Sequence, residues 1–211
     1  MANDGAEPSW MTWAREILAT AQTGLTYAEN PYDKERYESL RRLGVRMMAE
    51  GTGADAGRIL AVFSAQSGYA TPKVDVRAAV FQDDRILLVP ELADGGRWTL
   101  PGGWADINSS PAENIVREVR EEAGYEVTVR KLVSVFDKRC HAHPPAPIHA
   151  YKLFFLCDIV RAVEKSDLET GAVRFFGEDE IPELSLDRIV PAQIRRMFEH
   201  WRKPDLPTDY D

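Results

Sequence analysis

The spacing of apolar residues changes near Lys73, and this change divides the chain. Before Lys73, apolar side chains recur every three or four positions, which is typical of amphipathic helices. From Val74 to Val80 they occupy every second position, which is typical of a half-buried strand. The sequence therefore predicts a small helical N-terminal domain, residues 1–68, followed by a mixed α/β domain, residues 69–204.

Residues 1–68 predict two or three short helices. The first follows Ser9, a candidate N-cap, and runs toward Gly24; the second follows the link Asn30-Pro31, with Asp33 as its candidate cap. A third segment surrounds Ile59, Leu60, Val62 and Phe63. The first two apolar stripes are Trp10, Trp13, Ala14, Ile17, Leu18 and Ala21, then Tyr37, Leu40, Leu43 and Met47. Because such helices bury little surface alone, we expect them to pack on the rest of the chain or on a second subunit.

Residues 69–204 predict strands gathered around two helices. Asp83-Asp84 is expected to form a turn after the first strand, and the final helix carries an apolar stripe from Ile194 to Trp201. Residues 205–211 are expected to form a disordered tail. The strand candidates are residues 74–80, 85–90, 98–100, 127–136, 149–160 and 173–176.

The acidic balance of the chain limits its partners. Its 211 residues include 34 Asp and Glu against 26 Lys and Arg, a formal net charge of -8. This sign disfavours a large nucleic-acid surface or attachment to an anionic membrane. It does not exclude a phosphorylated ligand, because carboxylates that hold a divalent cation reverse the local field.

The cysteines and the first residues indicate a compartment. Cys140 and Cys157 cannot form a disulfide framework, and they lack the paired spacing of a zinc site. The chain does not start with the basic and apolar segments of a signal peptide, and it has no apolar run long enough to span a bilayer. We therefore predict a cytoplasmic protein with no membrane partner.

Residues 102–125 form the segment with the clearest chemistry. Ser110, Pro111 and Glu113 together predict a capping box at the start of a helix, and Gly124 predicts its end. The buried stripe of this helix is expected to be Ala112, Ile115, Val116, Val119 and Ala123. Beside it, Glu118, Glu121 and Glu122 share one face at positions i, i+3 and i+4.

Three glutamates on one helix face are most often simply solvated. Their mutual repulsion is relieved if a cation lies among them, and hard oxygen ligands at this spacing suit Mg²⁺ or Mn²⁺. The glutamates alone therefore leave open both a solvated helix face and a cation site, and the residues around them distinguish the two.

The surrounding residues resemble the signature of the Nudix hydrolase family, G-x5-E-x7-R-E-U-x-E-E-x-G-U, in which U is a bulky apolar residue. The positions in register are Gly103, Arg117, Glu118, Val119, Glu121, Glu122, Gly124 and Tyr125. The resemblance implies an α/β fold, the Nudix α-β-α sandwich with a mixed sheet. It also implies attack of water on a diphosphate, helped by a divalent cation.

One position departs from this signature. Ser109, preceded by Asn108, stands where the family has its first glutamate, which mainly supports the loop and pairs with the arginine. Its absence bears on the number of metal ions and on the catalytic rate. Ser109 is interpreted as a loop residue or an alternative cap, and a degraded active site is the other interpretation.

The resemblance extends to a subfamily with an added helical N-terminal domain, which includes CDP-choline pyrophosphatase-like enzymes that form dimers. It is carried by residues 13–44, by TPKVDVRAAVF and by DKRCHAHPPAPIHAYKLFF. It implies a homodimer, for which Trp10, Trp13, Ile17 and Tyr37 are the candidate contacts. Packing of these residues within their own chain is the alternative.

The resemblance implies roles for single residues. Glu118 and Glu122 are the principal candidate metal ligands, Glu121 is a third ligand or orients water, and the Gly103 carbonyl is an additional ligand. Arg117 would orient the glutamates, since its fork fits a carboxylate. The general base is either a glutamate of the signature or Glu169, in the loop before the last predicted strand.

Candidate substrate contacts lie outside this helix. His143 belongs to a histidine-containing loop, and Arg77 and Lys152 could reach an anion, although isolated basic residues are usually solvated. Trp98 is expected in the core, whereas Trp104 is the candidate for stacking on a base.

The leading functional hypothesis is a metal-dependent pyrophosphohydrolase acting on a nucleoside diphosphate linked to another moiety, a nucleotide-containing small molecule, with CDP-choline-like compounds favoured. The alternative within this class is ADP-ribose or another ADP-sugar. A different class is a catalytically weak, nucleotide-binding regulator. The intact glutamates and the net charge of -8 argue against a DNA-controlling form of the last.

Overall fold

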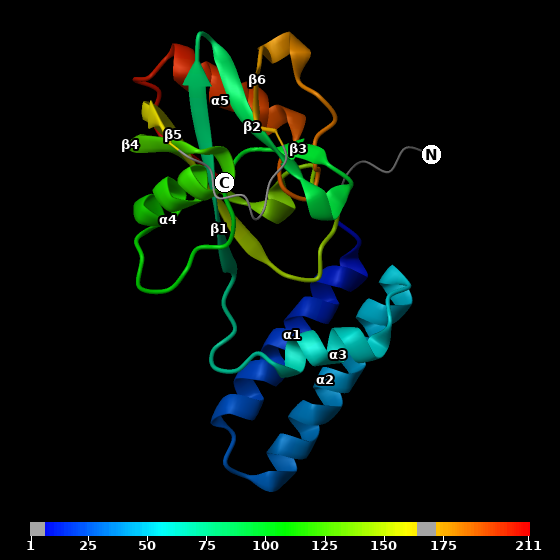
Figure 1. Cartoon of the computed structure of the whole chain (residues 1–211). Helices are drawn as coiled ribbons and strands as arrows, with labels where there is room; N and C mark the ends of the chain where they lie inside the picture. The colour runs from blue at the N-terminus through cyan, green and yellow to red at the C-terminus, as the bar shows by residue number, and fades with distance from the viewer. Residues whose placement is uncertain (1–6, 164–171) are drawn as a thin grey trace. The chain divides into compact units, whose positions relative to one another are not determined.

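The computed structural model describes residues 7–163 and 172–211, which form two compact units (Figure 1). The helical unit comprises the residues up to Pro72 together with Pro145–His149, and the sheet unit comprises Lys73–Pro144 and Ala150–Asp211. The predicted mixed fold with a helical N-terminal region is confirmed. In the part of the chain described, no helix combines the length and apolar character needed to cross a membrane.

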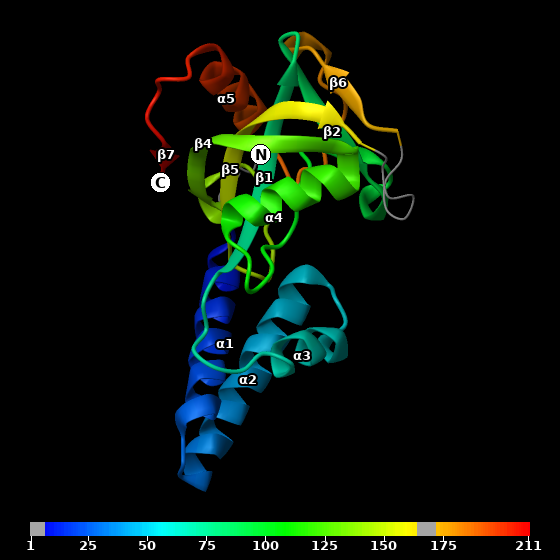
Figure 2. The ribbon, with the colours of Figure 1, turned by 60° about the vertical axis from the view of Figure 1, so that its left-hand side comes forward.

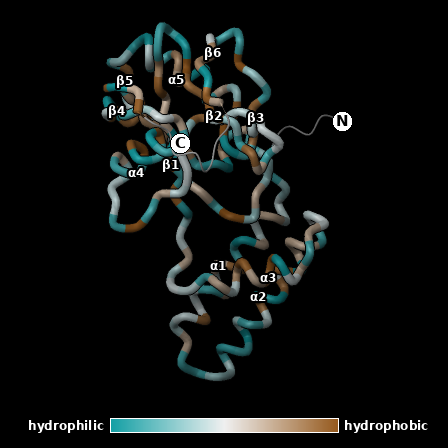
Figure 3. Tube along the Cα trace, viewed as in Figure 1, coloured by the Kyte–Doolittle hydropathy of each residue, from teal (hydrophilic) through white to brown (hydrophobic). Residues whose placement is uncertain are grey.

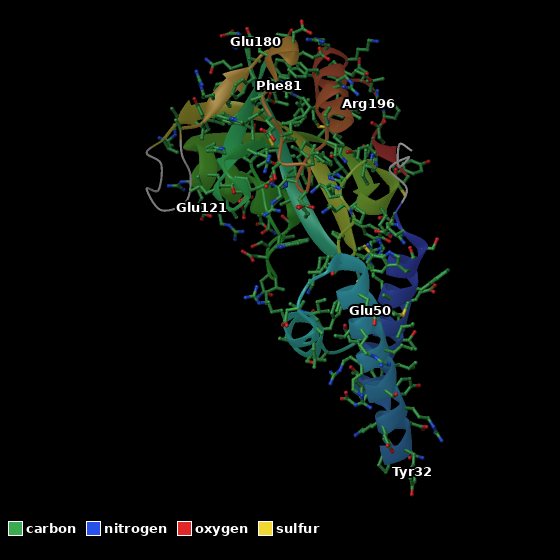
Figure 4. The ribbon with its side chains drawn as sticks, turned by 90° about the vertical axis from the view of Figure 1, so that its right-hand side faces the viewer. Tyr32, Glu50, Phe81, Glu121, Glu180 and Arg196 are labelled. Atoms are coloured by element: carbon green, nitrogen blue, oxygen red, sulfur yellow. The ribbon has the colours of Figure 1, made fainter. Side chains whose placement is uncertain are left out.

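From residue 7 onward, the helical unit contains three helices: α1 (Ser9–Tyr27), α2 (Pro31–Thr52) and α3 (Ala56–Ser64). The Asn30 side chain accepts a hydrogen bond from the Tyr32 backbone N–H at 2.8 Å, and Pro31 occupies the first turn, so α2 begins by local chemistry. Figure 4 shows Tyr32 at the turn between α1 and α2, and Figure 3 shows the hydrophilic start of α2.

Two expectations for the helix starts were wrong. Pro8, not Ser9, holds the N-cap position of α1, and it makes no side-chain capping bond. Asn30 caps α2, so Asp33 falls inside its first turn. Gly24 lies inside α1, where the ring of Tyr37 packs so closely that a Cβ would come within 2.3 Å of it. The contact with α2 therefore explains this glycine.

The core of the helical unit is small and differs in part from the predicted stripes. Its main cluster of buried residues is Met11, Ala14, Leu18, Val45 and Met48, and Ala21 of the predicted stripe is also buried. Trp13 is 57% exposed, and Leu43 is also exposed, because the α1–α2 contact uses a narrower face than the stripes suggest. None of the residues of α3 is buried.

Among the residues described, the sheet unit contains seven strands: β1 (Lys73–Gln82), β2 (Arg85–Glu91), β3 (Arg97–Thr99), β4 (Tyr125–Asp137), β5 (Ala150–Ala162), β6 (Arg174–Phe176) and β7 (Asp209–Tyr210). Their order is β3-β2-β1-β5-β4-β7, with β6 beside β2. β1 runs parallel to β5, whereas β4 and β5 are antiparallel, so the sheet is mixed. Asp83 and Asp84 adopt positive φ angles of 50° and 57° in the predicted turn between β1 and β2.

β1 is a central strand, buried on both faces, rather than the half-buried strand predicted. Val76, Ala78 and Val80 belong to one core, which contains residues of α4 (Pro111–Glu118). Ala79 and Phe81 belong to another, which contains residues of α5 (Pro191–Arg202). Because neighbouring side chains of a strand point to opposite faces, α4 and α5 cover opposite sides of the sheet (Figure 2).

The C-terminal residues are ordered, which corrects the predicted disordered tail. Ser134 and Val135 of β4 pair with Asp209 and Tyr210 of β7. Arg196 Nη2 donates to Asp209 Oδ1 at 2.7 Å, and His200 Nε2 lies 3.1 Å from Asp209 Oδ2. Both interactions join residues that are not neighbours in sequence, so the local composition could not indicate them.

Candidate active site

The helix that carries the glutamates begins as predicted. Ser110 Oγ accepts from the Glu113 backbone N–H at 3.2 Å, and the Glu113 carboxylate accepts from the Ser110 N–H at 2.7 Å. Pro111 is the first helical residue. Of the predicted buried stripe, Ile115, Val119 and Ala123 are fully buried in the core beside β1, whereas Val116 is partly buried.

The end of this helix differs from the prediction of a regular α-helix. α4 ends at Glu118, and Val119–Ala123 form a π-helical turn that closes at Gly124, whose φ is 71°. A π-turn takes more residues to close than an α-turn, so residues three apart are rotated further from each other. Glu121 therefore diverges from Glu118.

Glu118 and Glu122 both reach toward the loop that precedes the helix. Glu122 Oε2 accepts from the Gly102 backbone N–H at 2.8 Å. The Glu118 carboxylate lies against Gly103, 3.4 Å from the position that a Cβ would occupy there. Glu121 is exposed (Figure 4), and its Oε2 lies 3.9 Å from Arg117 Nε. The structure thus brings two of the three predicted glutamates to the glycine loop.

The backbone of this loop is attached to β1. Val76 N–H donates to the Gly103 carbonyl at 2.8 Å, Ala78 N–H donates to the Pro101 carbonyl at 2.9 Å, and Ala105 N–H donates to the Val74 carbonyl at 2.9 Å. Gly102 has a φ of 139°, and a Cβ there would lie 2.0 Å from the Val76 oxygen. Only glycine therefore fits between the loop and β1.

Two predicted site residues follow from this attachment. The Gly103 carbonyl, a candidate metal ligand, already accepts from Val76, which leaves one of its two lone pairs. Trp104 forms an isolated bridge with Asp75 and is 53% exposed, so its ring lies at the surface beside the loop. A stacking role for Trp104 stays a prediction.

Burial makes the ionised glutamates unfavourable. Burial raises the pKa of Glu122 to about 7, and the nearby charge of Glu118 adds to this effect, whereas the Gly102 N–H and Arg77 oppose it. Burial also raises the pKa of Glu118, against the contact with Arg117. Two partly buried carboxylates that share a site are the environment in which a bound cation is most favourable.

The donor set fits a hard divalent cation. No cluster of three or more His, Cys, Asp or Glu side chains arranged around a metal position occurs among the residues described. Mg²⁺, however, is commonly held by one or two carboxylates, with water and substrate phosphates completing its shell. Glu118 and Glu122 supply such a pair.

Arg117 contacts the glutamates as predicted, and it also contacts residues that the sequence analysis did not name. Its Nη2 lies 3.1 Å from Glu118 Oε1, 2.8 Å from Asp106 Oδ2 and 3.1 Å from Asn114 Oδ1. Asn114 is fully buried. The sequence contains a sign of this role, because an amide side chain at a buried helix position needs hydrogen-bond partners.

The structure places Arg77 and Lys152 inside the sheet unit, in an ion-pair network with Asp75. Arg77 is 4% exposed and Lys152 is 1% exposed. Arg77 Nε and Nη2 donate to the two Asp75 carboxylate oxygens at 2.8 and 3.0 Å, and Lys152 Nζ lies 3.0 Å from Asp75 Oδ1. Arg77 Nη1 also donates to the Leu100 carbonyl at 3.1 Å. This placement speaks against the predicted contact with substrate.

His143 is also buried, with 7% exposure. Its Nδ1–H donates to the Leu186 carbonyl at 2.6 Å, and within the described residues its Nε2 has no hydrogen-bond partner. Burial lowers the pKa of His143 to about 4, so the ring is neutral at pH 7. The predicted substrate role gains no support from this position. Glu169, the candidate base, lies outside the described residues.

Comparison with protein families identifies both parts of the chain. Residues 8–63 match the model of a UDP-X-like, N-terminal oligomerisation domain. Residues 71–199 match the model of the NUDIX domain.

Relatives and solved structures extend over most of the chain. A Bacillus subtilis protein named "Putative ADP-ribose pyrophosphatase YjhB" is 42% identical over 97% of this chain and 98% of its own length. A crystal structure of a UDP-X diphosphatase is 32% identical, covers 96% of this chain and 97% of its own, and has a TM-score of 0.61. An ADP-ribose pyrophosphatase from Streptococcus suis is 39% identical, covers 67% of this chain and 100% of its own, and also has a TM-score of 0.61.

Proposed function

This chain belongs to the Nudix hydrolase family, and we propose that it cleaves the diphosphate bond of a nucleoside diphosphate joined to a second moiety. The observation that carries the proposal is the pair Glu118 and Glu122, held against Gly102 and Gly103 at the end of the family's helix. Hydrolysis of a phosphoric anhydride depends mainly on placing such charged groups.

Glu118 and Glu122 are the residues that would hold Mg²⁺ or Mn²⁺. When bound, this cation supplies electrostatic stabilisation of the charge that builds on the phosphate oxygens. The Gly102 N–H fixes the Glu122 carboxylate, and Arg117 fixes that of Glu118. The Gly103 carbonyl contributes through its second lone pair, and Glu121, from its exposed position, orients water or serves as a third ligand.

The attacking water must lose a proton to a base. The two candidates for this base are a glutamate of the family signature and Glu169. Glu121 is the exposed glutamate of the signature, and its Oε2 lies 3.9 Å from Arg117 Nε. Replacing Glu121 and Glu169 separately by Gln distinguishes them, because only the loss of the base should remove the acidic limb of the pH–rate profile, in which the rate falls as the base becomes protonated.

The names of the relatives guide the choice of substrates. ADP-ribose and UDP-linked compounds come first, since relatives matching over most of the chain carry these names. CDP-choline, favoured by the sequence resemblance, is the third candidate. Trp104, exposed beside the loop, is the candidate for stacking on the base of any of them.

The helical unit is proposed to join two copies of the chain into a homodimer. The match of residues 8–63 to an oligomerisation domain and the exposed indole of Trp13 support this. Trp10, Ile17 and Tyr37 are the other candidate contacts. Light scattering of the full chain tests the proposal, and a monomeric mass at working concentration rejects it. The cytoplasmic location stays a prediction from sequence.

Product analysis of a substrate panel tests the proposed reaction. We expect Mg²⁺-dependent release of a nucleoside monophosphate from at least one of ADP-ribose, a UDP-sugar and CDP-choline, with ¹⁸O from labelled water in one phosphate product. Glu122→Gln should lower kcat at least about 100-fold, because it removes a charged ligand, while the amide oxygen can still accept from Gly102.

The control for this variant is Glu126→Gln, which removes an exposed glutamate paired with Arg161 on the neighbouring strand. It should keep the wild-type rate. Retained activity in Glu122→Gln would reject the metal assignment. Nucleotide binding without hydrolysis across the panel, in either Mg²⁺ or Mn²⁺, would reject the enzyme activity.

A further inference from the structure

Position 109 is the point at which the chain departs from its family signature. Ser109 has no carboxylate. It contacts the helix of the signature through its backbone, because the Ser109 carbonyl accepts a hydrogen bond from Asn114 Nδ2 at 3.2 Å. Position 109 therefore supplies no carboxylate to Arg117.

Asp106, three residues earlier, supplies a carboxylate to Arg117. Its Oδ2 lies 2.8 Å from Arg117 Nη2. The same nitrogen lies 3.1 Å from Glu118 Oε1. The guanidinium thus lies between a loop carboxylate and a proposed metal ligand, and its fixed planar fork suits this double contact.

Asn114 fixes the loop in the conformation that presents Asp106. Its Oδ1 accepts from the Asp106 backbone N–H at 2.9 Å. Its Nδ2 lies within hydrogen-bond distance of the carbonyls of Asp106, Ser109 and Ser110, at 3.4, 3.2 and 3.1 Å. Because Asn114 is fully buried, these bonds are shielded from competition with water.

The exposure of the pair decides what it contributes. Asp106 is exposed and Arg117 is partly exposed, and ion pairs in such positions add little to folding stability. Their effect therefore falls on the orientation of Arg117 and of the Glu118 carboxylate that it touches.

We propose that Asp106 takes over the role of the missing family glutamate: it is a positioning residue that holds Arg117, and through it Glu118, with Asn114 fixing the loop. This inference rests on the proposed function, because it assigns Glu118 to the metal site. In this interpretation the carboxylate that holds Arg117 has moved from position 109 to position 106, and the active site is not degraded.

Four variants test the proposal: Asp106→Ala, Ser109→Glu, the double variant with both changes, and the control Asp33→Ala. Asp33 forms an exposed ion pair with Arg36 in the helical unit, so its loss removes a comparable surface pair elsewhere. We expect Asp106→Ala to lower kcat about tenfold or more and to raise the Mg²⁺ concentration needed for half-maximal rate. Ser109→Glu and Asp33→Ala should stay within about twofold of wild type.

The double variant is the decisive measurement. A glutamate at position 109 restores the family's partner for Arg117, so the double variant should recover to within about threefold of wild type. A purely structural role for Asp106 would not be rescued from another position. A double variant as slow as Asp106→Ala, or an Asp106→Ala variant as fast as wild type, overturns the proposal.

Calorimetry without substrate measures Mn²⁺ binding to the four variants, which is a readout independent of turnover. Asp106→Ala should weaken Mn²⁺ binding, and the double variant should restore it. If wild type hydrolyses none of the panel, the proposed function fails, while this binding series still tests Asp106. Equal Mn²⁺ affinity in all four variants overturns the proposal even when the enzyme is active.

Discussion

Two arginines act on the two glutamates of the site, and their surroundings differ. Arg77 is buried, pairs with Asp75 and the Leu100 carbonyl, and acts on Glu122 through its charge. Arg117 is partly exposed and contacts Asp106 and Glu118 directly. Arginine therefore has two uses here: Arg77 stabilises the folded structure, and Arg117 orients the Glu118 carboxylate. Changes to Arg77 should damage stability, whereas changes to Arg117 should damage activity.

Arg77→Met should have the largest effect on stability. It leaves Asp75 with Lys152 alone and removes a donor from the Leu100 carbonyl, and breaking a buried ion network costs about 3–5 kcal/mol. Urea denaturation measures the change in the free energy of unfolding. Arg85→Met is the matched control, since Arg85 forms an exposed pair with Glu180 and should cost less than about 1 kcal/mol. Equal losses in the two variants would contradict the distinction.

Acid should lower the free energy of unfolding through His143, whose pKa burial lowers to about 4. Lys152, Lys138 and His141 act on this ring, so a proton on it adds charge beside cations. The unfolded chain takes up this proton near pH 6.5 and the folded chain only near pH 4, so the contribution of His143 to stability falls as pH decreases across this interval. The loss amounts to about 3 kcal/mol at the acid end.

Comparison with His143→Asn isolates this effect from the carboxylates that titrate in the same range. The asparagine amide can replace Nδ1 as donor to the Leu186 carbonyl, and it does not titrate. The difference in unfolding free energy between wild type and variant should therefore change between pH 6.5 and pH 4. A constant difference would show that His143 is not the group responsible.

Arg117→Met should have the smallest effect on stability, below about 1 kcal/mol, because the arginine is partly exposed. Its kcat should nevertheless fall about 10- to 100-fold, since Glu118 loses the contact that orients it. Urea denaturation and steady-state kinetics on one preparation check both parts. A large stability loss with normal kcat would reverse the roles assigned to the two arginines.

Local signals made part of the site predictable. The capping box of Ser110 and Glu113, Pro111 in the first turn and Gly124 at the end each depend on residues within a few positions of one another. They predicted the start of α4 and the glycine at which the following π-turn ends, and the apolar spacing identified the buried face. The turn at Asp83-Asp84 followed for the same reason.

Long-range pairing decided what the sequence analysis did not predict. Asp75 and Lys152 are register partners across the parallel strands β1 and β5, so the burial of Lys152 depends on a pairing between distant segments. The C-terminal residues are ordered by the edge of β4 and by Arg196, which the tail itself does not reveal. Asp106 was missed because a loop aspartate gives no sign of the helix residue that it contacts.

The attachment of the glycine loop to β1 has a thermodynamic consequence. Three backbone hydrogen bonds and the close approach of Gly102 to the Val76 oxygen leave this part of the site little conformational freedom. Ligand binding therefore loses little entropy there, a form of preorganisation. The entropic cost of binding should fall instead on residues 107 and 108, which are exposed and lie between the loop positions that Asn114 holds; Asn108 there has a φ of 63°.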